Sequence, residues 1–157
     1  MDHIRWHLAQ VNVAKAVGTR DSPEMKAFVD MLDEVNAEAD AAPGFVWRWE
    51  EAYEETGDDN FDAEMVLVNV SVWDSYESLQ AYVYSNLHRE VFQRRREWFT
   101  FMKENHFAMW WIPTGTTPTV EESLAKLNEL RENGPGPSVF SVRQRFAPTG
   151  EEIPWKS

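Results

Sequence analysis

Hydrophobic and polar residues alternate most regularly between residues 66 and 73 of this chain. Valine occupies every second position there, and the positions between the valines hold a leucine, an amide, a hydroxyl and an indole. The two sets are Val66, Val68, Val70 and Val72, and Leu67, Asn69, Ser71 and Trp73. This period of two predicts a strand whose two faces meet different surroundings. Directly after it, Asp74 and Ser75 offer helix caps and Glu77 stands in capping-box position, so a helix is predicted to begin there.

The first half of the chain divides into further elements by the same kind of pattern. A strand is predicted over residues 8–14, and an amphipathic helix begins near Pro23 and is closed by Pro43 and Gly44. Alternation over residues 45–50 predicts a second strand. The acidic segment 51–64 that follows is expected to be a solvated hairpin loop, because its Asp spacing does not match a calcium-binding loop.

The second half of the chain predicts two helices and two strands. The helix that begins after the valine-rich strand is expected to run to about Lys103, with an interruption near Ser85. Residues 106–112 predict a fourth strand, and Thr119 with Glu122 forms a capping box for a third helix, which ends at Gly134. A last short strand is predicted over residues 139–145, before a C-terminal arm.

The element order β-α-β-β-α-β, followed by an extra helix, predicts an α+β fold of the ferredoxin-like kind, with helices on one face of an antiparallel sheet. On this interpretation the helices cover the valines and the other sheet face is bare. The bare face would carry Gln10, Asn12, Asn69, Ser71 and Trp73. A face so rich in amides and indoles predicts a homodimer that closes a partly polar chamber between two subunits.

Length and composition narrow the class of protein. With 157 residues, of which 43% are hydrophobic, residues 1–157 are expected to form one domain, with a core over about residues 6–146 and an arm over 147–157. The net charge of −12 argues against nucleic acid or an anionic membrane as a partner. The absence of cysteine excludes disulfides and thiolate metal sites. No apolar run resembles a signal peptide or a membrane span, so a cytoplasmic protein is expected.

No metal site is predicted from the spacing of the possible ligands. His3 and His7 are four residues apart, which suits a metal only on a helix, and no helix is predicted there. His106 at the start of the fourth strand is expected to be structural or to lie at the chamber rim.

Several segments of the chain together resemble a known superfamily. They are LAQVNVAK, PGFVWRW, LVNVSVWDSYESLQAYVY, HREVFQRRREWF and WWIPTGTTPTVEESLAKL. Over about residues 8–146 the chain resembles the dimeric α/β-barrel superfamily that contains antibiotic-biosynthesis and haem-degrading monooxygenases, and within it a bacterial domain-of-unknown-function family. The resemblance implies the fold and a homodimer. It implies little about activity, because this architecture hosts cofactor-free oxygenases, haem enzymes, isomerases and plain binders.

The second long helix holds the candidate catalytic residues. From His88, the positions Phe92, Arg95 and Phe99 follow at steps of four, three and four, so they share one helical stripe. His88 could act as a general base, as a haem ligand or only as a hydrogen-bonding residue on the helix face. An arginine on an apolar stripe needs an anionic partner, which could be a negative group of a substrate or a carboxylate of the same chain.

The resemblance also allows haem to be considered as a cofactor. In the haem-degrading enzymes an asparagine on strand one, an aromatic residue on helix two and a histidine further along that helix shape the haem pocket. Asn12, Tyr82 and His88 are the nearest positions here. Tyr82 stands where those enzymes have Trp, and His88 comes four residues too early, so no cofactor is expected.

The predicted substrate-binding residues are mostly amides, hydroxyls and aromatic rings. They are Gln10, Asn12, Asn69, Ser71, Trp73, Tyr82, Phe92 and Trp110. Such groups could orient a carbonyl or phenol and stabilise a developing oxyanion, or they could hydrogen-bond across a dimer interface. The leading hypothesis is a small-molecule-binding dimer, monooxygenase-like or isomerase-like without a cofactor, acting on an aromatic or polyketide-like substrate. A non-catalytic binding or interaction dimer is the alternative, and a haem protein comes third.

Overall fold

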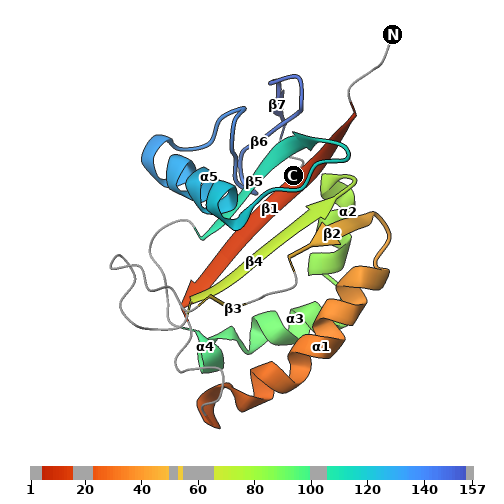
Figure 1. Cartoon of the computed structure of the whole chain (residues 1–157), viewed down its shortest axis with the longest axis vertical. Coiled ribbons are helices and arrows are strands. Elements are labelled where there is room, and N and C mark those ends of the chain that lie inside the picture. Colours follow the sequence, from red (N-terminus) through yellow and green to blue (C-terminus); the bar gives the residue numbers. More distant parts are fainter. Residues whose placement is uncertain (1–4, 16–22, 50–52, 55–65, 100–105, 155–157) are drawn as a thin grey trace.

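The centre of the molecule is an antiparallel sheet whose main strands lie in the order β2-β4-β1-β5 (Figure 1). The computed structural model describes residues 5–15, 23–49, 53–54, 66–99 and 106–154. A two-residue strand, β3, extends the pairing along β4. The strands are β1 Trp6–Lys15, β2 Phe45–Arg48, β3 Tyr53–Glu54, β4 Val66–Trp73 and β5 Phe107–Pro113.

The helices lie on both sides of this sheet (Figure 1). A short 3-10 helix, η1 (Pro23–Met25), leads into α1 (Lys26–Ala41), and α2 (Tyr76–Val83) follows β4. The remaining helices are α3 Asn86–Gln93, α4 Arg95–Trp98 and α5 Val120–Asn133. The predicted ferredoxin-like order is therefore confirmed, with α5 as an addition to it. None of the helices in the described part of the chain is long and apolar enough to cross a membrane.

The predicted helix ends that rest on local chemistry are confirmed. Ser75 Oγ accepts a hydrogen bond from Ser78 N at 3.1 Å and caps α2. Thr119 Oγ1 accepts one from Glu122 N at 3.0 Å and caps α5, which ends at Gly134. After α1 the chain turns at Gly44, where φ is +83° and a Cβ atom would overlap the side chains of Ser78 and Asp74. Only glycine fits this turn between α1 and β2.

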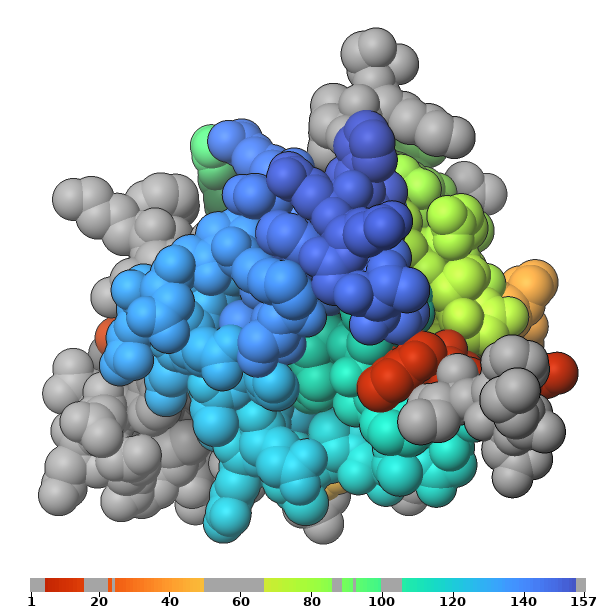
Figure 2. Space-filling model, turned by 90° about the horizontal axis from the view of Figure 1, so that it is seen from above, coloured from red at the N-terminus to blue at the C-terminus, as the bar shows by residue number. Residues whose placement is uncertain are grey.

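The predicted assignment of the two sheet faces is wrong. The valine face packs against α5 rather than against the first two helices. This face comprises Ala9, Val11, Val13, Val68, Val70, Val72, Ala108, Trp110 and Ile112, packed on Leu127, Leu130 and Val139. In Figure 2, α5 and the C-terminal segment form one continuous surface beside β5. Alternation along a strand shows that its two faces differ, but it does not show which helix covers which face.

The opposite side of the sheet, which we call the amide face, is not bare. It carries the predicted polar set, Gln10, Asn12, Asn69, Ser71 and Trp73, and it lies on the side of α1–α4. Trp73 packs with Leu79 and Tyr82 of α2. Leu67, on the same face, packs with Met25 and Phe28. The reason given for a homodimer, a sheet face open to a partner, therefore does not hold, and the dimer itself stays a prediction.

The second long helix is shorter and more broken than predicted. The predicted interruption at Ser85 separates α2 from α3, but the chain turns again at Arg94 and becomes extended at Phe99. Arg94 there binds Glu97 at 2.8 Å and lies 4.6 Å from the centre of the Trp98 ring. No glycine or proline marks these breaks. Residues 100–105, over which the helix was expected to continue, lie outside the described residues.

The C-terminal segment also departs from the prediction. Of residues 139–145, for which a strand was predicted, only Arg145 lies in a strand. Phe140 alone bridges to Met109, through N–O distances of 3.0 and 2.9 Å, and the chain then turns back between Ser141 and Gln144. A separate hairpin joins β6 (Arg145–Phe146) to β7 (Glu152–Ile153), and β7 lies within the predicted arm. The second strand likewise ends at Arg48, after an irregularity between Phe45 and Trp47.

Candidate functional site

Polar side chains from β1 and β4 form a hydrogen-bonded network on the amide face. The strand register places Gln10 opposite Ser71 and Asn12 opposite Asn69. Gln10 Nε2 donates to Ser71 Oγ at 2.6 Å and to Asn69 Oδ1 at 2.7 Å. Asn12 Nδ2 donates to Gln10 Oε1 at 3.1 Å and to Asn69 Oδ1 at 3.3 Å. We call these four residues the amide network.

The network is closed at one end and accessible at the other. Gln10 and Ser71 are 2% and 6% exposed, and Trp73 Nε1 donates to Ser71 Oγ at 2.9 Å. Asn12 and Asn69 are only half-buried. Buried polar groups must be hydrogen-bonded, and the inner groups satisfy one another. The half-buried asparagines are therefore the part of the network that a ligand can reach.

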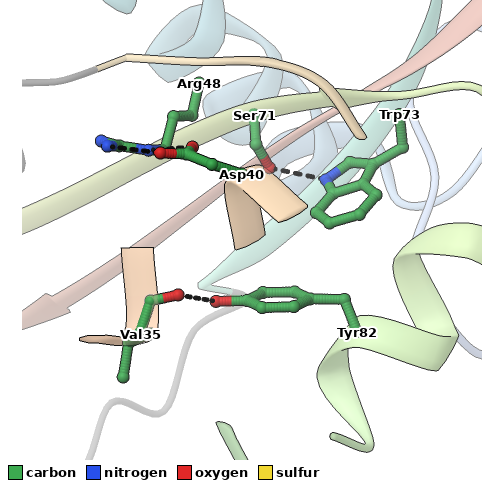
Figure 3. Close-up of polar contacts among 6 residues, drawn as sticks. All are labelled: Val35, Asp40, Arg48, Ser71, Trp73 and Tyr82. Atoms are coloured by element: carbon green, nitrogen blue, oxygen red, sulfur yellow. Dashed lines mark hydrogen bonds and ion pairs between the residues drawn. The ribbon is translucent and has the colours of Figure 1, made fainter. Parts of the chain in front are cut away.

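Aromatic rings lie next to the closed end of the network. The rings of Trp73 and Tyr82 are stacked, with centroids 5.2 Å apart and planes 25° from parallel. Phe45 meets Trp73 edge-on at 5.5 Å. Figure 3 shows the Tyr82 ring lying below the indole, with its hydroxyl donating to Val35 O of α1 at 3.2 Å. These contacts tie α1 and α2 to the sheet beside the amide network.

Tyr82 is a neutral hydrogen-bond donor in this site. Burial raises the pKa of Tyr82 well above its ordinary value, and the nearby carboxylates of Glu38 and Asp40 add to the effect while Arg48 opposes it. A phenol with a raised pKa stays protonated at neutral pH and does not serve as a base.

A bidentate ion pair links α1 to β2 near Tyr82 (Figure 3). Arg48 Nε lies 2.8 Å from Asp40 Oδ1, and Arg48 Nη2 lies 3.3 Å from Asp40 Oδ2. The arginine side chain is 20% exposed and the aspartate side chain 48%. Much of the charge of Arg48 is thus already compensated within the chain.

The structure brings together most, but not all, of the predicted substrate-binding residues. Gln10, Asn12, Asn69, Ser71 and Trp73 form one group, and Tyr82 joins it through the indole of Trp73. Trp110 does not, because it lies on the valine face with α5.

The neighbouring indole, Trp111, is on the amide face and was missed by the sequence reasoning. It stands opposite Leu8 in the sheet register, and its Nε1 donates to Phe146 O at 2.7 Å. The strand FAMWWIP is apolar at nearly every position, so its sequence has no alternation that would show which side chains point to which face of the sheet.

The predicted catalytic residues lie on two separate helices. His88 and Phe92 belong to α3, and their side chains lie outside what the structure describes. Arg95 begins the single turn of α4 and is exposed. The continuous stripe that linked His88 to Phe99 is broken at Arg94, so their common role stays a prediction.

The described residues contain no cluster of three or more His, Asp or Glu side chains suited to a metal ion. His106 is exposed, and its carbonyl accepts a hydrogen bond from Val13 N at 2.9 Å. His3 lies outside the described residues. The groups that the amide network offers are neutral amides and a hydroxyl, which suit a polar organic group rather than a metal.

Fold and site together define a ferredoxin-like α+β protein with an amide network between its sheet and its first two helices. The chain matches the family described as "Domain of unknown function (DUF3291)" over residues 7–155, and it belongs to that family. This confirms the predicted resemblance to a domain-of-unknown-function family. A search of curated proteins gave no match.

Several solved structures are similar to this chain at low sequence identity. A conserved protein from Methanosarcina mazei Go1 is 15% identical, with a TM-score of 0.49 over 66% of this chain and 90% of that chain. NE2512, a protein of unknown function from Nitrosomonas europaea, is 11% identical, with a TM-score of 0.47 over 74% of this chain and 97% of that chain. SnoaB, a cofactor-independent oxygenase from Streptomyces nogalater, is 16% identical, with a TM-score of 0.44 over 74% of this chain and 98% of that chain.

Proposed function

We propose that this domain binds a small aromatic or polyketide-like molecule at the amide network. The observation that carries the proposal is the pairing of Asn12 and Asn69 at the accessible end of a network whose inner members are saturated. A network that only needed to stabilise the sheet could be replaced by apolar residues, as on the valine face. Polar groups held in place at an accessible position are instead typical of a binding site.

The activity that suits this site is a cofactor-independent reaction of the monooxygenase-like or isomerase-like kind. An amide N–H of Asn69 can donate to a substrate oxygen and stabilise negative charge that develops there. In this proposal His88 takes a proton from the substrate and Arg95 pairs with the negative charge that the substrate then carries, while Trp73 and Tyr82 border the bound ring.

A non-catalytic binding protein is the second candidate, and one observation favours it. Among the described residues beside the network, Tyr82 is protonated and Arg48 is paired with Asp40. The proposed base, His88, is on α3 and not on a strand of the site. Binding therefore needs only the groups of the amide network and the rings beside it, whereas turnover needs His88 as well.

Binding is tested with freshly purified protein and two asparagine variants. Native mass spectrometry should detect a bound small molecule in the wild type, and an absorption spectrum would reveal haem by its Soret band. Asn69→Val removes the amide that is proposed to donate to the bound molecule, so it should weaken retention of that molecule at least about tenfold. Asn128→Ala, at an exposed position of α5, is the matched control and should retain it. Equal retention by both variants would contradict the proposed site.

The homodimer is kept as a proposal from the family resemblance alone. Light scattering at micromolar concentration measures it directly. A stable monomer would remove the dimer without affecting the binding proposal, because every residue of the amide network belongs to one chain.

A further inference from the structure

We infer that the ligand of the amide network is a neutral molecule that presents one hydrogen-bond donor beside one acceptor, as an aromatic lactam or an enolised hydroxyketone does. This inference rests on the proposed function. It goes further because it identifies the pair of hydrogen-bonding groups on the ligand that the site recognises.

The inner residues have little capacity left for a ligand. Both N–H groups of Gln10 are used, one by Ser71 Oγ and one by Asn69 Oδ1. Gln10 Oε1 accepts from Asn12, and Ser71 Oγ also accepts from the indole of Trp73. Since an indole N–H can only donate, this last bond is fixed in direction. Recognition therefore falls to the outer residues.

The outer residues present one donor and one acceptor side by side. Asn12 uses its Nδ2 and Asn69 uses its Oδ1 inside the network. Asn12 Oδ1 and Asn69 Nδ2 make no hydrogen bond to any described residue. The two side chains face each other across β1 and β4 and are half-buried. A ligand that satisfies both atoms must donate to the first and accept from the second.

Rotating the amides does not change this requirement. If all three amides turn by half a rotation together, Asn69 Nδ2 and the Ser71 hydroxyl donate to Gln10 Oε1, and Gln10 Nε2 donates to Asn12 Oδ1. Asn12 then offers N–H groups outward and Asn69 offers its carbonyl. The donor and acceptor exchange places, but the site still presents one of each. The same site can thus pair with either the lactam or the lactim form of a cyclic amide, since each form has one donor beside one acceptor.

The electrostatics of the site favour a neutral ligand. The amide network has no charged member, and Tyr82 is held protonated by burial. The guanidinium of Arg48, whose charge acts on Tyr82, is bound in two places by Asp40. The whole chain carries a net charge of −12, which disfavours the approach of an anion.

Three nearly isosteric probes test the inference by isothermal titration calorimetry on the full chain. The lactam 2-quinolone has an N–H beside its carbonyl, coumarin has a ring oxygen in place of that N–H, and 1-methyl-2-quinolone has the N–H blocked. The lactam should bind at least about tenfold more tightly than either analogue, because each analogue leaves an amide acceptor of the site unpaired. The anion 2-naphthoate should bind more weakly than the lactam.

A variant shows where this discrimination arises. Asn12→Val removes one of the two outer amides, so the lactam and coumarin should bind it with affinities that differ less than about threefold. Asn128→Ala is the control and should keep the full preference for the lactam. A thermal melt shows whether Asn12→Val is folded, and if it is not, the wild-type probe series alone decides.

The outcomes separate this inference from the proposed function. If the three neutral probes bind with equal affinity and Asn69→Val abolishes their binding, the site binds aromatic molecules but the donor–acceptor inference is overturned. Tighter binding of 2-naphthoate than of the lactam overturns the inferred neutrality of the ligand. If no probe binds with a Kd below about 1 mM and no molecule is retained in native mass spectrometry, both the inference and the proposed function are overturned.

Discussion

The two faces of the sheet are covered by helices in different ways. On the valine face, α5 packs onto side chains that are almost all apolar, and Val11, Val70 and Val72 are no more than 1% exposed. On the amide face, α1 and α2 cover a surface that contains Gln10 and Ser71, whose polar groups need hydrogen-bond partners. The valine face only has to exclude water. The amide face also has to satisfy polar groups, and the proposed function gives these groups a role in recognition.

The strongest test of this contrast puts an amide on the valine face. Val70→Asn should destabilise the protein by about 4 kcal/mol, because it removes buried methyl groups and places an amide beneath α5 with no partner. Urea unfolding measures the loss. The same change at Val46, which is 41% exposed on the edge strand β2, should cost less than about 1 kcal/mol. Equal losses would mean that the valine face is not a sealed core.

A second test loosens the helix that covers the valine face. Leu127 is 2% exposed and packs into the valine cluster, so Leu127→Ala should cost about 3 kcal/mol through lost burial and the cavity left behind. Thermal unfolding measures the change in stability. Asn128→Ala, on the outside of the same helix, should leave the melting temperature nearly unchanged. If α5 only rested on the surface, the two variants would behave alike.

The third test removes an amide from the amide face. Asn69→Val should cost about 1 to 2 kcal/mol, because Gln10 and Asn12 each lose an acceptor but Asn69 itself is only half-buried. This loss is smaller than for the reverse change at the neighbouring Val70. Urea unfolding of the two variants side by side compares the faces directly. A gain in stability for Asn69→Val would show that the amide is kept entirely for a ligand.

The smallest effect is expected at Tyr82, and it depends on pH. Tyr82→Phe should cost about 1 kcal/mol near neutral pH through loss of the hydrogen bond to Val35 O. Because burial raises the pKa of Tyr82, the phenol loses its proton at a lower pH in the unfolded chain than in the folded protein. The stability that the protonated phenol contributes is complete below the ordinary tyrosine pKa of about 10 and falls as the pH rises above it.

The free energy of unfolding, measured at about pH 8 and about pH 10.5, should therefore change differently with pH in the wild type and in Tyr82→Phe. The wild type should lose more stability between the two conditions than the variant does. An identical loss in both proteins would assign the alkaline sensitivity to other groups.

The sequence was sufficient to predict those elements that are determined by residues close together in the chain. The alternation of residues 66–73 gave β4, the Thr119 cap and Gly134 gave both ends of α5, and Gly44 marked the turn after α1. Period, capping and a positive φ are properties of a few consecutive residues, so they can be read before the chain is folded. The amide network was predicted as a group for the same reason, since its members alternate along two strands.

Only the tertiary structure decided which side of the sheet each helix covers. The sequence indicates that Asn69 and Val70 face opposite ways, but the placement of α5 on the valines depends on contacts between Leu127 or Leu130 and strands far away along the chain. The same holds for the facing of Trp110 and Trp111 in an apolar strand, and for the turn at Arg94. The free energy gained by burying apolar surface depends on the area buried and not on which helix buries it. An apolar sheet face can therefore be covered by any amphipathic helix that reaches it. The partner that each face takes is therefore a property of the folded molecule as a whole.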